Sequence, residues 1–262
     1  MLFVVAPTAI LLVFSVLRGV GPDDVRATFT LDNYRQAFGE PYPRIFARSI
    51  AYAALTTGLC LLLGYPVGYF IGRSPERWRN RLLLLVMVPF LTSFLVRAYA
   101  WAVILHDQGL LNGVLKALRI IPAILPHDLR LLDTPAAVIV GLVYTYLPFM
   151  ILPIYASAEK LDQSLIEAAW DLGAGPMRAF WRVIFPLTWP GVAAGIALVF
   201  IPSIAMFAVT RILGGGKVLL IGDVIEDQFG ASGNPPMGAA LGILLLALFL
   251  ATFLLLPRRS NH

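Results

Sequence analysis

The sequence has 262 residues, of which 59% are apolar and 13% charged, whereas an average soluble domain is about half apolar and a quarter charged. A soluble chain of this length could bury a core, but it would still need polar side chains to cover its surface. The composition and the mean hydropathy of +0.81 therefore indicate that lipid surrounds much of the protein. The net charge of +5 comes from basic residues scattered between apolar runs, a pattern that argues against nucleic-acid binding.

Six runs of the chain are long and apolar, and only the third of them contains a charged residue. As helices, such runs are long enough to cross about 30 Å of hydrocarbon, and they lack the alternation of a membrane barrel. We expect an all-α membrane protein with six transmembrane helices. The first run lacks a basic residue before it and a small-residue cleavage pattern after it, so we interpret it as a span and not as a signal peptide. The runs are 1–17, 49–72, 82–105, 134–158, 183–210 and 229–256.

Basic residues are densest directly after the second run, at Arg73, Arg77, Arg79 and Arg81. Short cytoplasmic segments of membrane proteins carry an excess of Lys and Arg, so we place this segment in the cytoplasm. Both termini are then also cytoplasmic. The inner segments become 73–81, 159–182 and 257–262, and the outer segments become 18–48, 106–133 and 211–228.

Small residues and prolines shape the predicted spans. Gly64, Gly68 and Gly72 recur every four residues, which puts them on one stripe of a helix and lets a neighbouring backbone approach closely. Prolines in or beside the spans free backbone groups that neighbours or cavity water must satisfy. They indicate either broken helices along a pathway or tolerated kinks. These prolines are Pro66, Pro89, Pro148, Pro153, Pro186, Pro190 and Pro202.

Arg97 is the one charge well inside a predicted span. Placing an arginine at the centre of a membrane helix costs about 2.5 to 3.5 kcal/mol on insertion scales. This side chain therefore needs either a partner or a route to the membrane–water interface. Tyr99 and Trp101 follow it, and aromatic residues are typical of membrane interfaces. Arg97 therefore either reaches the outer interface or, with Tyr99 and Trp101, lines a pathway.

The fourth predicted span contains a second aromatic group, Tyr144, Tyr146 and Phe149. Aromatic ring faces attract cations, so these three residues are further candidates for the wall of a pathway. Ordinary aromatic packing is the alternative explanation.

Signatures of an enzyme or a cofactor site are not found in the sequence. His106, His127 and His262 are not spaced as metal ligands, and Cys60 is the only cysteine. The segment Gly214-Gly215-Gly216-Lys217 lacks the spacing of a phosphate-binding loop. We expect no catalysis, no metal and no cofactor in this chain.

The inner segment 159–186 is longer than a connection between adjacent spans needs. Ser164 and Glu167 have the spacing of a capping box, which predicts a helix that starts at Ser164 and ends before Gly173. A second helix would then reach Pro186. The first helix either fits a groove of a partner protein or rests on the lipid surface. Its large apolar side chains are Leu165, Ile166, Trp170 and Leu172.

The same segment resembles the EAA loop in the membrane-spanning subunits of ATP-binding-cassette importers. Glu167-Ala168-Ala169 is followed after three residues by Gly173, and after nine more by Val183-Ile184-Phe185-Pro186. Val183 and Phe185 replace the usual Ile and Leu but keep the apolar character. In that family the loop forms a coupling helix that inserts into a cleft of the cytoplasmic ATPase. The resemblance implies this coupling role here for Glu167, Ala168, Ala169, Trp170, Gly173 and Pro186.

Other segments resemble the spermidine/putrescine permeases of that superfamily. Permeases for iron, phosphonate or thiamine share parts of these segments, so they remain alternatives. The matching segments are 29–34, 64–66, 95–99, 147–150, 159–162, 214–217, 220–222 and 228–229.

The resemblance implies a single permease domain over residues 1–262, located in the bacterial inner membrane. Its partners would be an ATPase dimer that binds ATP and Mg²⁺, a second permease subunit and an extracytoplasmic binding protein. The expected function is uptake of a small solute, for which a polyamine is the leading candidate. However, no Asp or Glu lies within the six runs, and Arg97 could equally favour an anion. A secondary transporter would be expected to show embedded acids or internal symmetry.

Overall fold

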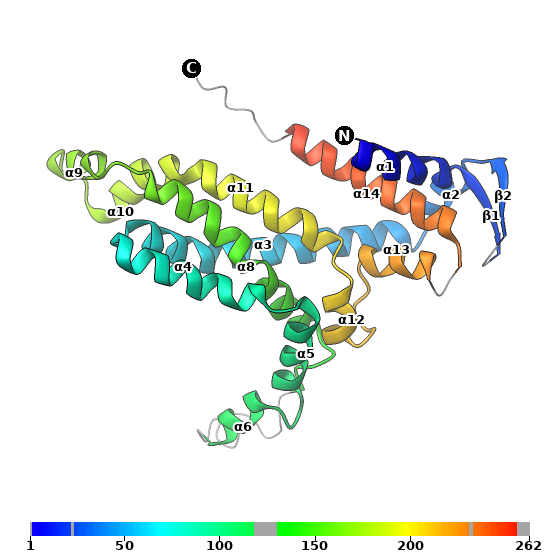
Figure 1. Ribbon diagram of the computed structural model, residues 1–262, viewed down its shortest axis with the longest axis horizontal. Coiled ribbons are helices and arrows are strands. Elements are labelled where there is room, and N and C mark those ends of the chain that lie inside the picture. Colours follow the sequence, from blue (N-terminus) through cyan, green and yellow to red (C-terminus); the bar gives the residue numbers. More distant parts are fainter. Residues whose placement is uncertain (1, 22–23, 118–129, 231–232, 256–262) are drawn as a thin grey trace. The chain divides into compact units, whose positions relative to one another are not determined.

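The computed structural model describes residues 2–21, 24–117, 130–230 and 233–255. His127, His262 and the predicted inner segment 257–262 lie outside these residues. The described chain is mostly helical (Figure 1), as expected for apolar runs that must satisfy their own backbone groups in lipid. It forms two compact units. The first comprises the described residues of Met1–Ile50, Ala205–Phe207 and Leu219–His262, and the second comprises those of Ala51–Ile204 and Ala208–Val218.

The first unit contains helices and one β-hairpin, which corrects the expectation of an all-α protein. The two strands are antiparallel, with Leu17 opposite Phe29. Their sequences include Val20, Val25 and Thr28, and such β-branched residues favour strands. The elements are α1 (Leu2–Ser15), β1 (Leu17–Gly21), β2 (Asp24–Phe29), α2 (Asp32–Ala37), the beginning of α3 (Tyr42–Arg73), α13 (Ile221–Phe229) and α14 (Pro235–Leu255).

Within this unit α14 packs against α1, α2, α13 and β1. The Asn33 amide fixes α2 to the end of α1, because it donates to the Ser15 carbonyl (3.0 Å) and the Leu17 carbonyl (2.8 Å). The Ser49 hydroxyl links α3 to α13 by accepting a hydrogen bond from the Ile221 amide (2.8 Å). These contacts satisfy polar groups where the helices of the unit pack together.

The second unit is a helix bundle centred on α8 (Pro135–Glu159), which packs against α4, α5, α11 and α12. The helix begins at the Thr134 cap, whose hydroxyl accepts from the Ala137 amide at 3.3 Å. The other elements are the rest of α3, α4 (Glu76–Leu91), α5 (Phe94–Leu105), α6 (Leu110–Ala117), α9 (Gln163–Asp171), α10 (Pro176–Ala179), the π-turn η1 (Phe180–Ile184), α11 (Phe185–Ile204) and α12 (Ala208–Gly214).

The predicted glycine stripe is confirmed as the contact surface of α3 on α8. A Cβ added to Gly64 would lie 3.0 Å from Met150 Cγ, and one added to Gly68 would lie 2.9 Å from the Ile151 carbonyl oxygen. At Gly72 it would lie 2.7 Å from the Cβ of Ala158. The two helices are therefore so close that a side chain at these positions has no room.

Helix α11 approaches α8 from another side in the same way. A Cβ added to Gly195 would lie 2.6 Å from Met150 Sδ, and one added to Gly191 would overlap the Pro153 carbonyl oxygen. Met150, which is fully buried, therefore lies between a glycine of α3 and a glycine of α11. Close packing fixes α8 between these two helices.

The third predicted span, 82–105, is wrong as a single helix. The chain bends by 89° between α4 and the helical segment that starts at Phe94. Thr92 is extended at the break, and its hydroxyl donates to the Pro89 carbonyl at 2.7 Å. Such a side-chain hydrogen bond competes with the backbone hydrogen bonds of the helix, and Pro89 itself has no amide hydrogen to donate.

The fifth predicted span, 183–210, also differs from the structure at both ends. Pro186 does not end a helix, because the chain is helical without a break from Pro176 to Ile204. A π-turn at Phe180–Ile184, in which the Phe185 amide donates to the Phe180 carbonyl, accommodates this proline near its end. The helix stops after Ile204, and α12 starts at Ala208.

By length and composition, three helices in the described part of the chain could span a membrane, and the bent pair α4–α5 would make a fourth. The three are Tyr42–Arg73, Pro135–Glu159 and Pro176–Ile204. The first and last predicted runs correspond to the shorter apolar helices Val5–Ser15 and Pro235–Ala251. The count of six spans therefore stays a prediction.

The glycine contacts predict a position-specific loss of stability along α3. Gly72→Val should destabilise the protein by about 1 to 3 kcal/mol, because the new side chain overpacks the contact with Ala158. Gly58→Val is the matched control, since nothing lies within 4 Å of a Cβ at Gly58. Thermal unfolding of the purified protein in detergent measures the difference. Equal midpoints for the two variants would contradict the close α3–α8 contact.

Candidate functional site

Helix α9 begins earlier than the capping box predicts. It covers Gln163–Asp171, and its N-cap is Asp162, whose Oδ1 accepts a hydrogen bond from the Ser164 amide at 2.9 Å. Ser164 is therefore inside the helix, and the predicted start there is wrong by one residue. The bonds from Ser164 lower the pKa of the Asp162 carboxyl. Because the cap needs the ionised carboxylate, it is lost only as the pH falls through this lowered pKa.

The predicted end of the helix at Gly173 is confirmed. Gly173 has a φ of +78°, a conformation that glycine adopts without strain. Its amide donates to the Trp170 carbonyl (2.8 Å), and the Ala174 amide donates to the Ala169 carbonyl (2.9 Å). These two bonds form a Schellman motif, which satisfies the last carbonyl groups and turns the chain sharply.

A small hydrophobic cluster attaches α9 to the rest of the bundle. Ile166 is the one buried residue of α9. It packs with Leu161 and Ile184, and the partly buried rings of Tyr69 and Phe180 cover this cluster. The helix is therefore fixed along a single edge and leaves its other faces free.

Two arginines of the segment 73–81 hold the beginning of the loop 159–186, which contains α9. Arg73 donates to the Leu161 carbonyl at 2.8 Å and also bonds the side chain of Gln163. Arg79 forms an ion pair with Glu159, the last residue of α8. The loop is therefore connected to α3 and α4 by polar bonds as well as by apolar packing.

An aromatic group fixes the return of the loop into α11. The Tyr65 ring of α3 contacts Phe180 edge-on, with 5.6 Å between ring centroids, and its hydroxyl bonds Thr188 at 2.9 Å. The Phe185 and Trp181 rings also pack together at 5.3 Å. Both ends of the segment 159–186 are thus rigidly connected to the bundle.

The structure brings most of the predicted coupling residues together on exposed faces of α9. Glu167, Ala168 and Trp170 are exposed, Ala169 is half-buried, and Gly173 is exposed at the end of the helix. Pro186 is also exposed but lies separately, in the first turn of α11. Large apolar side chains share the free surface: the exposed fractions are 46% for Leu165, 51% for Trp170 and 88% for Leu172.

Arg97 lies where α4 bends into α5, and it forms a cation–π contact with Phe90. Its guanidinium carbon is 5.2 Å from the centroid of Phe90, and one of its nitrogens is 3.4 Å from the Pro89 carbonyl oxygen. Phe90 in turn packs edge-on against Phe149 of α8, with 5.1 Å between centroids. Arg97 and Phe149 are therefore connected through Phe90, a residue that the sequence did not single out.

The remaining candidate pathway residues fall in separate places in the second unit. Trp101 of α5 packs edge-on against Tyr144 of α8 at 5.4 Å. The buried Tyr146 donates its hydroxyl to the Pro202 carbonyl of α11 at 3.1 Å, and its ring lies 6.3 Å from that of Phe149. This bond satisfies the hydroxyl inside the bundle.

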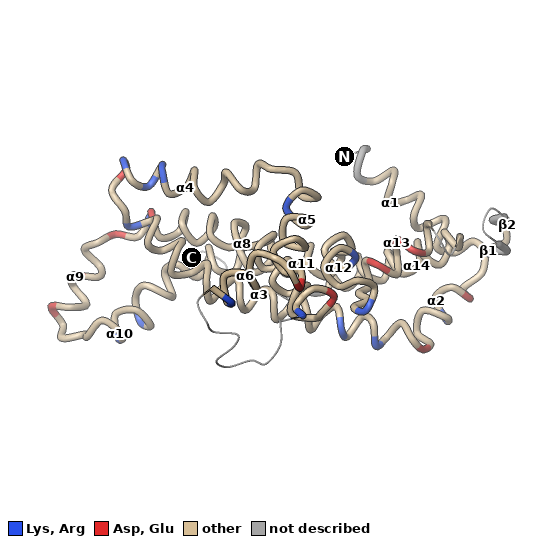
Figure 2. The backbone as a smooth tube through the Cα atoms, turned by 90° about the horizontal axis from the view of Figure 1, so that it is seen from below, with Lys and Arg blue, Asp and Glu red and all other residues tan. Residues whose placement is uncertain are grey.

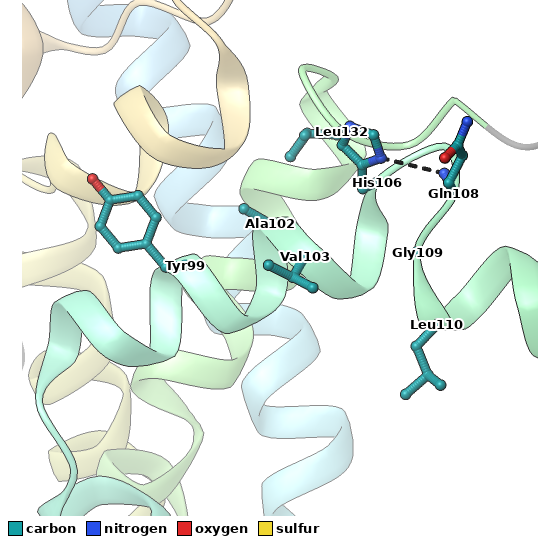
Figure 3. A pocket seen from close by; sticks show the side chains of 8 residues that line it. All are labelled: Tyr99, Ala102, Val103, His106, Gln108, Gly109, Leu110 and Leu132. Atoms are coloured by element: carbon teal, nitrogen blue, oxygen red, sulfur yellow. Dashed lines mark hydrogen bonds between the residues drawn. The ribbon is translucent and has the colours of Figure 1, made fainter.

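Tyr99 is exposed and lies apart from these pairs. Together with Ala102 and Val103 it lines a pocket of about 370 Å³ beside α5 and the turn that follows (Figure 3). In that turn the Gln108 amide donates to Nδ1 of His106 at 3.3 Å. The aromatic candidates therefore do not form one continuous wall within the described residues of this unit.

Residues 64–258 match the protein family described as "Binding-protein-dependent transport system inner membrane component". The chain is 42% identical over 259 residues to the "Spermidine/putrescine transport system permease protein PotB" of Haemophilus influenzae, a match that covers 99% of this chain and 89% of that protein. It is 43% identical over 244 residues to the protein of the same name from Escherichia coli (strain K12), a match that covers 93% of this chain and 87% of that protein.

A solved structure shows the same fold. It is that of "a bacterial ABC transporter involved in the import of the acidic polysaccharide alginate", to which the chain is similar with a TM-score of 0.66. The similarity covers 99% of this chain and 91% of the other, at 17% sequence identity. At so low an identity the likeness shows the fold alone.

The contacts of Arg73 predict that this side chain holds the start of α9. In Arg73→Ala the Leu161 carbonyl and the Gln163 side chain lose their charged donor, so local opening of residues 162–172 should increase severalfold. Hydrogen exchange of the purified protein, read by mass spectrometry, measures this opening. Arg48→Ala removes an exposed arginine near the beginning of the same helix and is the control. Equal exchange in the two variants would mean that Arg73 does not hold the loop.

Proposed function

The chain belongs to the family of binding-protein-dependent transport system inner membrane components, and from this premise we propose that it is the permease subunit through which an ATP-binding-cassette importer takes up a polyamine. The membership confirms the resemblance drawn from the EAA-type loop. It also agrees with the apolar helices of an inner-membrane protein.

We propose a single permease domain with six membrane spans and with both termini in the cytoplasm. The long helices, the bent pair α4–α5 and the two shorter apolar helices fall on the six apolar runs of the sequence, which supports this count. The arginines between α3 and α4 support the orientation, because positive charge favours the cytoplasmic side. In this orientation the loop that contains α9 faces the cytoplasm.

Helix α9 is the proposed coupling helix, and its mode of attachment is the observation that carries this proposal. It buries only Ile166 in its own chain and leaves Leu165, Trp170 and Leu172 exposed. A short amphipathic helix that leaves large apolar side chains exposed fits a hydrophobic groove of a partner. Its rigid connections at Arg73 and Arg79 would allow it to transmit force into the bundle.

The charges of α9 disfavour the alternative of a helix that rests on lipid. Its sequence contains Glu167 and Asp171, follows Asp162, and includes no Lys or Arg. The cytoplasmic leaflet is negatively charged and attracts basic helices. A protein groove with a basic residue opposite Glu167 is therefore the better partner.

In this proposal the energy comes from partner subunits. An ATPase dimer would bind ATP and Mg²⁺, and its closure would move α9 as a rigid lever that switches the bundle between outward-facing and inward-facing states. A second permease subunit would complete the pathway, and an extracytoplasmic binding protein would deliver the solute. This chain would contribute half of the pathway and no ATPase site.

The names of the similar proteins support a polyamine as the solute. The six apolar runs contain no acidic residue that could bind a polycation tightly. Ring faces and backbone carbonyls can replace some of its water, so a weak transit path would be sufficient if the binding protein selects the solute. We propose that Trp101, Tyr144 and Phe149 belong to this path, with Arg97 partly shielded by Phe90.

The coupling proposal predicts a specific effect of Glu167. Glu167→Ala should lower both uptake and solute-stimulated ATP hydrolysis about tenfold or more, because a charge-assisted contact contributes about 1.5 to 3 kcal/mol. Asp171→Ala removes an exposed acid from the same helix and should have a much smaller effect. Both rates are measured in reconstituted complexes of verified assembly. Unchanged rates in Glu167→Ala would reject the assigned role.

The solute is tested separately from the coupling. We expect the assembled transporter to hydrolyse ATP faster when its binding protein is loaded with spermidine or putrescine, and not when iron, phosphonate or thiamine is supplied. The ATPase rate in proteoliposomes measures the response. Stimulation by one of the other three solutes would reject the polyamine but keep the permease.

A further inference from the structure

A pocket of about 480 Å³ lies where α3 ends and α4 begins, next to the loop that holds α9. Its lining is mostly apolar, although it is open at the surface: 64% of Phe70 and 49% of Trp78 are exposed. Phe70 belongs to the last turn of α3, while Trp78 and Leu82 are one turn apart on α4. The lining residues are Phe70, Arg73, Ser74, Pro75, Trp78 and Leu82.

Positive charge lies beside this apolar pocket. Basic residues gather where α4 begins (Figure 2). The guanidinium carbon of Arg81 lies 5.5 Å from the centre of the Trp78 ring, and Arg73 is part of the lining. Arg77 is exposed one turn before Arg81. Arg79 is neutralised by Glu159, and Asp162 lies near Arg73, so Arg77 and Arg81 are the positive charges at the start of α4 that remain to be balanced, with Glu76 as the acid of the same helix end.

The end of α4 adds hydrogen-bond donors to these charges. Pro75 is its N-cap and provides no side-chain cap. The amides of Trp78 and Arg79 bond back to the Pro75 carbonyl at 2.9 and 3.0 Å, and the amides before them are free to point out of the helix. Helix N-termini of this kind favour phosphate groups.

We propose that this pocket binds one anionic phospholipid. The phosphate would lie against Arg77, Arg81 and the beginning of α4, and an acyl chain would fill the apolar space along Phe70 and Leu82. A soluble anion would not need the apolar wall, and a neutral lipid would not need the arginines. Charge complementarity and an open apolar pocket at the end of a membrane helix therefore select a lipid with a negative headgroup.

Arg73 connects this lipid site to the coupling loop. The same side chain that lines the pocket donates to the Leu161 carbonyl and bonds Gln163. A lipid in the pocket would restrict the movement of this side chain and so hold the start of α9. This consequence for coupling rests on the proposed function, whereas lipid binding itself does not.

Native mass spectrometry of the purified transporter complex tests the site. With phosphatidylglycerol and phosphatidylcholine of identical acyl chains, we expect retention of one phosphatidylglycerol at least tenfold more strongly than phosphatidylcholine. Each arginine near an anionic surface changes affinity about fivefold. Arg77→Gln combined with Arg81→Gln should therefore weaken phosphatidylglycerol binding about 25-fold. The matched control is Arg44→Gln combined with Arg48→Gln, near the beginning of α3, and should leave binding unchanged.

A second comparison tests whether the site binds a whole lipid or only a phosphate headgroup. Glycerol phosphate in excess should not displace the lipid, because it cannot fill the pocket, and Trp78→Ala should weaken retention. Equal retention of the two lipids, or equal effects of the two double variants, would overturn the proposal. So would binding to the isolated subunit that disappears in the assembled complex, because a protein partner would then occupy the pocket. None of these measurements involves ATP, so failure of the site and failure of the coupling proposal are distinguishable.

Discussion

The close approach of backbones around α8 is the constraint on which the second unit depends. Glycines of α3 and α11 let both helices pack closely against α8, and Met150 of α8 lies buried between Gly64 and Gly195. Tightly packed helices transmit displacement and do not absorb it. Because α8 contains Tyr144 and Phe149 and ends at Glu159, this packing joins the middle of the bundle to the loop that holds α9.

Helix α4 provides a second connection between the same two regions. Near its beginning Arg79 pairs with Glu159, and near its end Phe90 contacts both Phe149 and the charge of Arg97. A movement of α9 would therefore reach the bend at Thr92 through α4 as well as through α8. Two parallel connections explain how one short helix, attached through a single buried isoleucine, could act as a lever in the proposed mechanism.

Sequence periodicity predicted the contacts that depend on residue spacing, and it missed those that depend on tertiary packing. The stripe Gly64, Gly68 and Gly72 and the helix end at Gly173 each have a local physical signal. Phe90 has none, because one phenylalanine in an apolar run resembles any other. Tyr99 and Trp101, two residues apart on a helix, had to face different sides, so their separation was predictable. At the bend after Leu91 the side chains of Thr92 and Arg97 both donate to the Pro89 carbonyl, an arrangement that residue spacing alone does not indicate.

Cross-linking from α9 tests the central claim most directly. Cys60 is buried, so a cysteine introduced as Ala168→Cys gives one accessible thiol on the exposed face of the helix. In the purified transporter, a short reagent that joins thiols to lysines should connect this position to the ATPase subunit, whereas Arg48→Cys should give no such product. A product with the extracytoplasmic binding protein, or none with the ATPase, would contradict the account.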